Sequence, residues 1–189
     1  MKKFMILMLA LTVGLIACNK DDDDDDNNNT TPTFQEKIVG QYIFTSGTFN
    51  EPITFFNVMA AGDTVTLPAG TNASVIVASV LLGDSPCDNA SNTALEMRDD
   101  YTLYYVCLGE SNEEQMGTWE ADGDNNTISL NVNTDIGQLA IPITDVTLTD
   151  TGLEGNITTL PVPIDLLQPV GATNMQFANV AVVFTKVPN

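Results

Sequence analysis

Residues 116–132 read Met-Gly-Thr-Trp-Glu-Ala-Asp-Gly-Asp-Asn-Asn-Thr-Ile-Ser-Leu-Asn-Val, and this stretch decides the fold class. In residues 128–132, three aliphatic side chains alternate with a serine and an asparagine, the pattern of a strand with one buried face. The polar residues 122–126, which include a glycine, predict a turn that leads back to a strand at residues 116–121. The stretch therefore predicts an antiparallel hairpin.

The period-two pattern recurs along the chain after residue 34. Further strands are expected at residues 38–45, 53–59, 64–67, 94–97, 101–107, 139–143, 153–159 and 180–187. Residues 72–82 carry a 3.6-residue apolar stripe and are the one expected helix. A change of phase predicts a β-bulge near Thr144 and Asp145. Pro161 and Pro163 predict that their strand ends there or runs along an edge. Eight or nine short strands favour an antiparallel barrel or a sandwich.

The composition is strongly acidic. Twenty-five Asp and Glu stand against six Lys and Arg, a formal net charge of −19, and there is no histidine. Such a surface repels nucleic acid, whose affinity for proteins comes mainly from cation–phosphate contacts. The commonest general base and metal ligand is missing as well. We therefore expect no nucleic-acid partner, no metal, no cofactor and no enzymatic activity.

The first seventeen residues have the features of a signal peptide. Two lysines precede a thirteen-residue, nearly apolar run at 4–16, which is shorter than the roughly 20 residues of a membrane span. The sequence Leu-Ile-Ala-Cys at 15–18 resembles the lipobox of bacterial lipoproteins, in which the cysteine is acylated and becomes the mature N-terminus. The alternative is a free or buried Cys18. The resemblance implies anchoring to a membrane through lipid on Cys18.

A polar segment follows the proposed lipid site. Residues 19–33 contain six consecutive aspartates, 21–26, and too few apolar residues to form a core. The simpler interpretation of this segment is a solvated spacer. Acidic residues directly after the lipidated cysteine also resemble the export signal of surface lipoproteins of Gram-negative bacteria, which implies display on the outer membrane. The expected organisation is a signal peptide at 1–17, a lipidated tether at 18–33 and one domain at 34–189.

Two cysteines remain in the expected domain. An even pair in an exported chain indicates a disulfide between Cys87 and Cys107, and the alternative is two buried thiols. If strands 94–97 and 101–107 flank the turn 98–100, the bond lies at the open end of this hairpin. Trp119 is then expected beneath it in the core.

The order of several short motifs resembles the lipocalin-like (calycin) domains of bacterial surface lipoproteins. These motifs are Cys87-Asp88-Asn89, Leu95-Glu96-Met97, Asp99-Asp100-Tyr101-Thr102, Cys107, Gly117-Thr118-Trp119 and Gly40-Gln41-Tyr42. The chain departs from the family pattern with Tyr42 in place of tryptophan and Asp100 in place of a turn glycine. The resemblance implies an antiparallel meander that closes into a barrel of about eight strands with one short helix.

Two functions are consistent with such a barrel. The first is binding of a small apolar molecule or a glycan at the barrel mouth, lined by Tyr42, Phe44, Tyr104 and Trp119. The second is a structural or interaction protein of the cell envelope with a filled barrel. The volume of the interior distinguishes them, because a ligand needs an enclosed pocket of roughly 300 Å³ or more. Separately, Asp63-Thr64-Val65 resembles a bacterial O-glycosylation sequon, which makes Thr64 a candidate acceptor.

Overall fold

The computed structural model describes residues 31–56, 63–134, 137–164 and 175–188. By its internal contacts the chain divides into two units, Met1–Thr31 and Pro32–Asn189. The predicted signal peptide, Cys18 and the acidic run lie outside the described residues. All elements below belong to the second unit.

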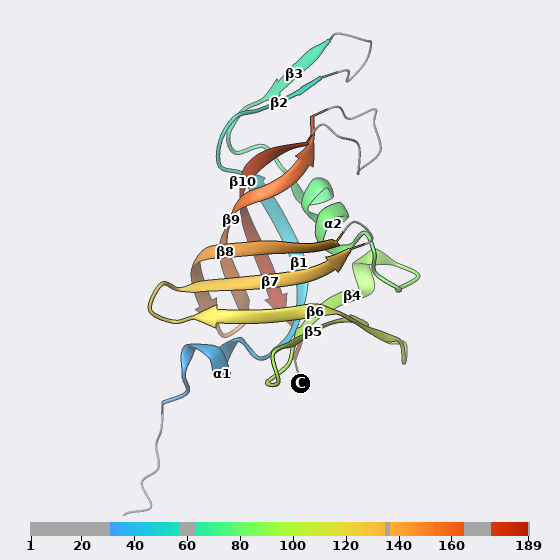
Figure 1. Cartoon of the computed structure of the whole chain (residues 1–189), viewed down its shortest axis with the longest axis vertical. Helices are drawn as coiled ribbons and strands as arrows, with labels where there is room; N and C mark the ends of the chain where they lie inside the picture. The colour runs from blue at the N-terminus through green and yellow to red at the C-terminus, as the bar shows by residue number, and fades with distance from the viewer. Residues whose placement is uncertain (1–30, 57–62, 135–136, 165–174, 189) are drawn as a thin grey trace, which may run out of the picture. The chain divides into compact units, whose positions relative to one another are not determined.

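Eight antiparallel strands form a closed barrel, as predicted (Figure 1). They run around the barrel in the order β1-β10-β9-β8-β7-β6-β5-β4, and β1 pairs with β4 to complete the ring. Because neighbours in the ring are mostly neighbours in the chain, the barrel is a meander. The strands are β1 (Gly40–Phe49), β4 (Thr93–Met97), β5 (Thr102–Cys107), β6 (Glu113–Asp122), β7 (Thr127–Thr134), β8 (Gly137–Thr149), β9 (Gly152–Pro163) and β10 (Met175–Lys186).

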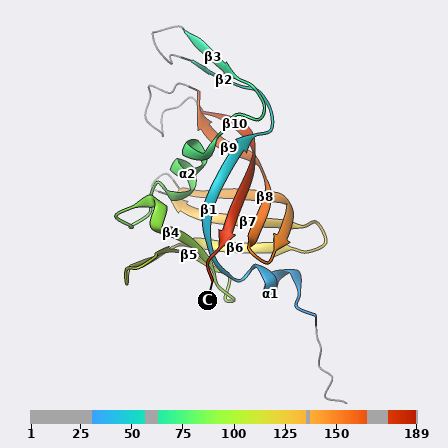
Figure 2. The same cartoon turned by 180° about the vertical axis from the view of Figure 1, so that it is seen from behind.

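The first and last strands close the barrel. β10 pairs with both β1 and β9, and Figure 2 shows β1 and β10 side by side. β10 covers the strand predicted at 180–187 up to Lys186 and begins earlier, at Met175. Its inward side chains, such as Val180, Val182 and Phe184, are at most 3% exposed.

The hairpin that indicates the fold class forms as predicted. Asp122 pairs with Thr127 across the turn, and Trp119 pairs with Leu130. Gly117 is needed for this close pairing, because a Cβ there would lie 1.9 Å from the carbonyl oxygen of Asn131. The stretch 116–132 therefore supplies two adjacent barrel strands.

The predicted bulge is also present. The β8–β9 register shifts between Thr144 and Thr147, and Asp145 adopts a left-handed conformation with φ 53°. The backbone at the bulge bonds to a neighbouring turn: the N–H of Val146 donates to the carbonyl of Asn126 at 2.8 Å. The bulge thus bends β8 toward the β6–β7 turn.

An insertion separates β1 from β4 in the chain. It contains a two-stranded sheet, β2 (Ile53–Phe56) and β3 (Thr64–Leu67), followed by α2 (Ser74–Leu82). The expected strand 53–59 begins as predicted, and its last three residues lie outside the described residues. The expected helix is confirmed as α2. Its buried face consists of Val77, Leu81 and Leu82.

Two short helical segments were not predicted. α1 (Phe34–Ile38) precedes β1, which therefore begins at Gly40 rather than at residue 38. A helix of five residues cannot show a 3.6-residue period. Its start is nevertheless marked by a capping box between Thr33 and Glu36, and that signal was readable. The 3₁₀ turn η1 (Ala90–Asn92) precedes β4.

The predicted register of the β4–β5 hairpin is wrong by two residues. Met97 pairs with Leu103 rather than with Tyr101. The turn is longer than expected, because the backbone N–H of Arg98 donates to the carbonyl of Thr102. Tyr101 lies between them and adopts a left-handed conformation with φ 67°. Tyr101 is 47% exposed and does not share the buried face of Leu103.

The prolines of β9 mark an edge, one of the two predicted outcomes. β9 continues to Pro163 and pairs there with β10, whereas its pairing with β8 stops at Ile157. Pro161 and Pro163 have no N–H to donate to a further strand. The β9–β10 pair therefore extends beyond the barrel. Residues 165–174, between β9 and β10, lie outside the described residues.

Candidate functional site

The interior of the barrel is filled by side chains. The predicted ligand-lining residues Tyr42 and Trp119 are at most 1% exposed, and Phe44 packs edge-on against Phe184 with ring centres 5.6 Å apart. A cavity of about 10 Å³ lies among the interior side chains, about the volume that one water-sized probe occupies. It is lined by Tyr42, Leu95, Met97, Leu103, Leu130, Ile143, Leu153 and Phe184.

Helix α2 packs into the barrel near the β2–β3 insertion. The Cβ position of Gly47 on β1 lies 2.8 Å from a methyl carbon of Val77, so this glycine lets the helix approach. The backbone N–H of Gly47 donates to the hydroxyl of Ser74 at 3.0 Å. At the other end of the helix, the Tyr105 hydroxyl donates to the carbonyl of Leu81 at 2.8 Å. Apolar side chains and a bonded tyrosine therefore fill the interior at the α2 end of the barrel.

Tyr104 does not line the interior. It alternates with the buried Leu103 and Tyr105 and so points to the outer face of β5. There its ring lies beneath the guanidinium of Arg98, with the central carbon 3.7 Å from the ring centre. The prediction failed for Tyr104 because the phase of β5 places only every second residue inside.

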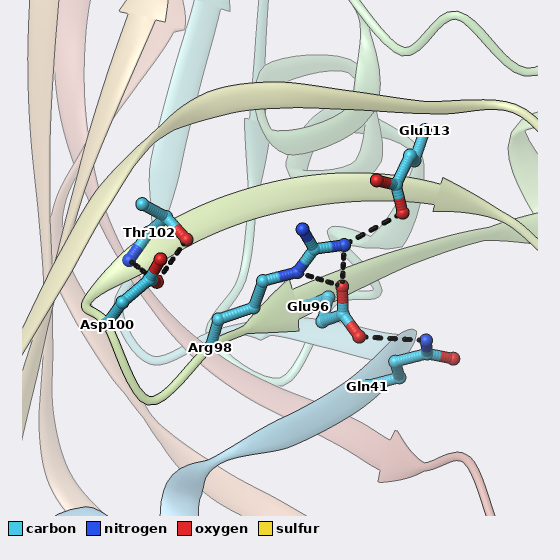
Figure 3. A network of polar contacts seen from close by, with 6 residues as sticks. All are labelled: Gln41, Glu96, Arg98, Asp100, Thr102 and Glu113. Atoms are coloured by element: carbon cyan, nitrogen blue, oxygen red, sulfur yellow. Dashed lines mark hydrogen bonds and ion pairs between the residues drawn. The ribbon is translucent and has the colours of Figure 1, made fainter.

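Arg98, the only arginine of the sequence, holds a polar network that joins four strands (Figure 3). Its Nε donates to Glu96 Oε2 at 2.6 Å, and its Nη2 donates to Glu113 Oε2 at 2.8 Å. Gln41 Nε2 donates to the other Glu96 oxygen at 3.0 Å. These bonds tie β1, β4 and β6 together on the outer face, and the contact of Arg98 with the Tyr104 ring adds β5.

We expect Arg98→Met to lower the free energy of unfolding by about 1–2 kcal/mol, because it removes charge-assisted hydrogen bonds and a cation–π contact at a partly exposed site. Urea unfolding followed by far-ultraviolet circular dichroism measures this change. Arg98→Lys is the matched control, since it keeps the positive charge but loses the planar guanidinium that bonds to Glu96 and Glu113. The part of this loss that comes from the ion pairs of Arg98 should be smaller at high salt, because salt screens exposed charges. A loss below about 0.3 kcal/mol for Arg98→Met would contradict a structural role.

Trp119 lies at the opposite end of the β4–β5 hairpin from the disulfide. Its backbone N–H donates to Tyr101 and its Nε1 donates to Arg98, at 2.9 and 2.8 Å. Cys107 stands five residues beyond Thr102, about 17 Å away at 3.3 Å per residue. The disulfide Cys87–Cys107 is present, with its Cα atoms 5.3 Å apart, but the expectation that Trp119 lies beneath it is wrong.

A hollow of about 900 Å³ opens between α1 and the β8–β9 turn, which lie at the end of the barrel away from α2 (Figure 1). Tyr42 contributes to its lining from β1, and Phe34, Glu36 and Lys37 from the α1 helix. Asp150 and Lys186 line it as well, with the neutral polar side chains of Asn126, Thr147 and Thr149. Lys186 Nζ donates to the carbonyls of Val39 and Lys37 at 3.0 and 3.4 Å.

Two further predicted positions, Thr64 and the turn at 122–126, are exposed. Thr64 is exposed at the start of β3, so it is accessible for modification. Asp122 accepts hydrogen bonds from the N–H groups of Asp124 and Asn125. This is the geometry of a turn, in agreement with the predicted hairpin. Among the described residues, no group of three or more Asp, Glu, Cys or His side chains is placed to hold a metal ion.

Comparison with known proteins gives no match to a family model, to a curated protein or to a solved structure. Within the described residues, no helix has the length and apolar character needed to cross a membrane.

Sequence reasoning missed Phe34, Lys37, Arg98 and Lys186. One signal was available, because only three cations follow the tether in a chain with 25 acids. Each of them lies at a specific place, Arg98 in the four-strand network and the two lysines at the hollow.

Proposed function

We propose that this chain is a lipid-anchored lipoprotein of the outer membrane whose filled barrel acts as a structural and interaction module, without enzymatic activity. The observation that supports this function is the interior cavity of about 10 Å³. An eight-stranded barrel is wide enough either to enclose one small ligand or to be filled by its own side chains. Here the side chains fill it, and partners are therefore recognised by the outer surface.

Anchoring and display rest on sequence features. Lipid on Cys18 holds the mature protein at the membrane, and the aspartates 21–26 carry it to the cell surface. Two or more acyl chains give stable anchoring where a single chain does not. The acidic outer surface selects neutral or basic partners in the envelope, because like charges repel across an interface.

Native mass spectrometry of the protein extracted from its own membrane tests this proposal. We expect the mature chain to begin at an acylated Cys18 and to carry no enclosed apolar molecule. Cys18→Ser should remove the acyl mass and leave the signal peptide attached. A stoichiometric apolar ligand on the wild-type protein would favour the carrier function instead. An added sugar mass on the peptide that contains Thr64 would establish that residue as a glycosylation site.

A further inference from the structure

The hydroxyl of Tyr42 is the unusual feature of the hollow beside α1. Tyr42 is 1% exposed, yet its hydroxyl has no hydrogen-bond partner among the described residues. No described side-chain oxygen or nitrogen is both fully buried and unpartnered, so this oxygen reaches an accessible surface. Tyr42 lines both the small interior cavity, where no polar atom is exposed, and the hollow. Its hydroxyl is therefore assigned to the hollow.

Tyr42 and Lys186 are positioned as hydrogen-bond donors. Burial raises the pKa of Tyr42 to about 12, so its hydroxyl keeps its proton at physiological pH. Lys186 has three N–H donors and uses two of them on backbone carbonyls. Its position depends on Gly40, where φ is 145° and a Cβ would lie 2.8 Å from Lys186 Cε. The backbone therefore holds one ammonium donor beside the tyrosine.

Hydrogen-bond acceptors also line the hollow. Glu36 and Asp150 supply carboxylate acceptors, and Lys37 balances their charge together with Lys186. Phe34 packs against Gly123 and contributes an aromatic wall. The lining thus combines donors, acceptors and two aromatic residues, Phe34 and Tyr42, with no net charge among its Lys, Asp and Glu side chains.

These features select a class of ligand. An anion would meet a lining with no net positive charge, on a chain of net charge −19. An apolar molecule would leave the recessed hydroxyl of Tyr42 unpaired. A neutral molecule with many hydroxyl groups can donate and accept at the same time, and one face of a sugar ring packs on an aromatic ring. We propose that the hollow between α1 and the β8–β9 turn binds a neutral saccharide, with the Tyr42 hydroxyl and Lys186 as donors.

The two buried tyrosines provide a matched pair of variants. Tyr42→Phe removes the hydroxyl that faces the hollow, and Tyr105→Phe removes the hydroxyl that bonds to Leu81 near the opposite end of the barrel. The full mature chain and both variants are applied to an array of neutral oligosaccharides built from glucose, galactose, mannose, xylose and N-acetylglucosamine. Affinities for each bound oligosaccharide are then measured by titration calorimetry. Thermal unfolding of each variant reports its stability separately.

We expect Tyr42→Phe to weaken saccharide binding about tenfold, the effect of one lost hydrogen bond, with an unchanged melting midpoint. Tyr105→Phe should bind like the wild type and melt at a lower temperature, because the carbonyl of Leu81 loses its partner. Three results would overturn the proposal: no binding of any neutral oligosaccharide at millimolar concentration, binding that Tyr42→Phe leaves unchanged, or binding confined to acidic saccharides or to peptides.

Discussion

Trp119→Ala is expected to lower the free energy of unfolding by about 3–5 kcal/mol, the range for removal of a large aromatic side chain from a core. Trp119 is 0% exposed. Its truncation leaves a cavity and also removes the Nε1 hydrogen bond to Arg98 and the contact with the Tyr101 ring, whose centre lies 5.8 Å away. A loss of this size is a large part of the net stability of a small domain.

The variant removes the only tryptophan of the chain, so urea unfolding should be followed by far-ultraviolet circular dichroism. Trp119→Phe is the control. It retains an aromatic ring and loses the N–H donor, and we expect it to cost less than half as much as the alanine variant. Equal losses for the two variants would show that the hydrogen bond, and not the packing, determines the effect.

Replacing both Cys87 and Cys107 by serine is expected to lower the free energy of unfolding by about 2–4 kcal/mol, because the bond restricts the unfolded chain. The bond joins the last residue of β5 to a segment 20 residues earlier. Comparison of the melting midpoint of the oxidised wild type with that of the double variant measures the loss.

Trp119 fluorescence provides an internal control for this experiment. Because Trp119 lies at the opposite end of the hairpin, its emission in the folded double variant should match that of the wild type. A shifted emission would mean that the bond is needed for the fold and not only for its stability. Two free thiols, counted by alkylation of oxidised and unfolded protein, would show that the bond is absent.

The segment between Cys87 and β4 curls. Its 3₁₀ turn η1 is supported by the Asn89 side chain, which accepts from the N–H of Ser91. Cys107 lies opposite Thr93, because the turn of the β4–β5 hairpin contains two more residues than expected.

Local features of this fold could be predicted from the sequence alone. The strand at 127–132, its turn at 122–126, the bulge at Asp145 and helix α2 each depend on residues that are neighbours in the chain. Side-chain period and turn chemistry are set at that range. The partner of Cys87 was also predictable, since one other cysteine remains after Cys18.

Only the tertiary structure decided whether the barrel is hollow, which hairpin register forms and where the candidate site lies. The register depends on Tyr101 adopting a left-handed conformation, which is uncommon for an aromatic residue and is stabilised here by contacts with Trp119. The filled interior depends on the summed volumes of side chains from all eight strands. Tyr42, Asp150 and Lys186 are distant in sequence and meet at one hollow only because closure of the barrel brings the ends of β1, β8 and β10 together.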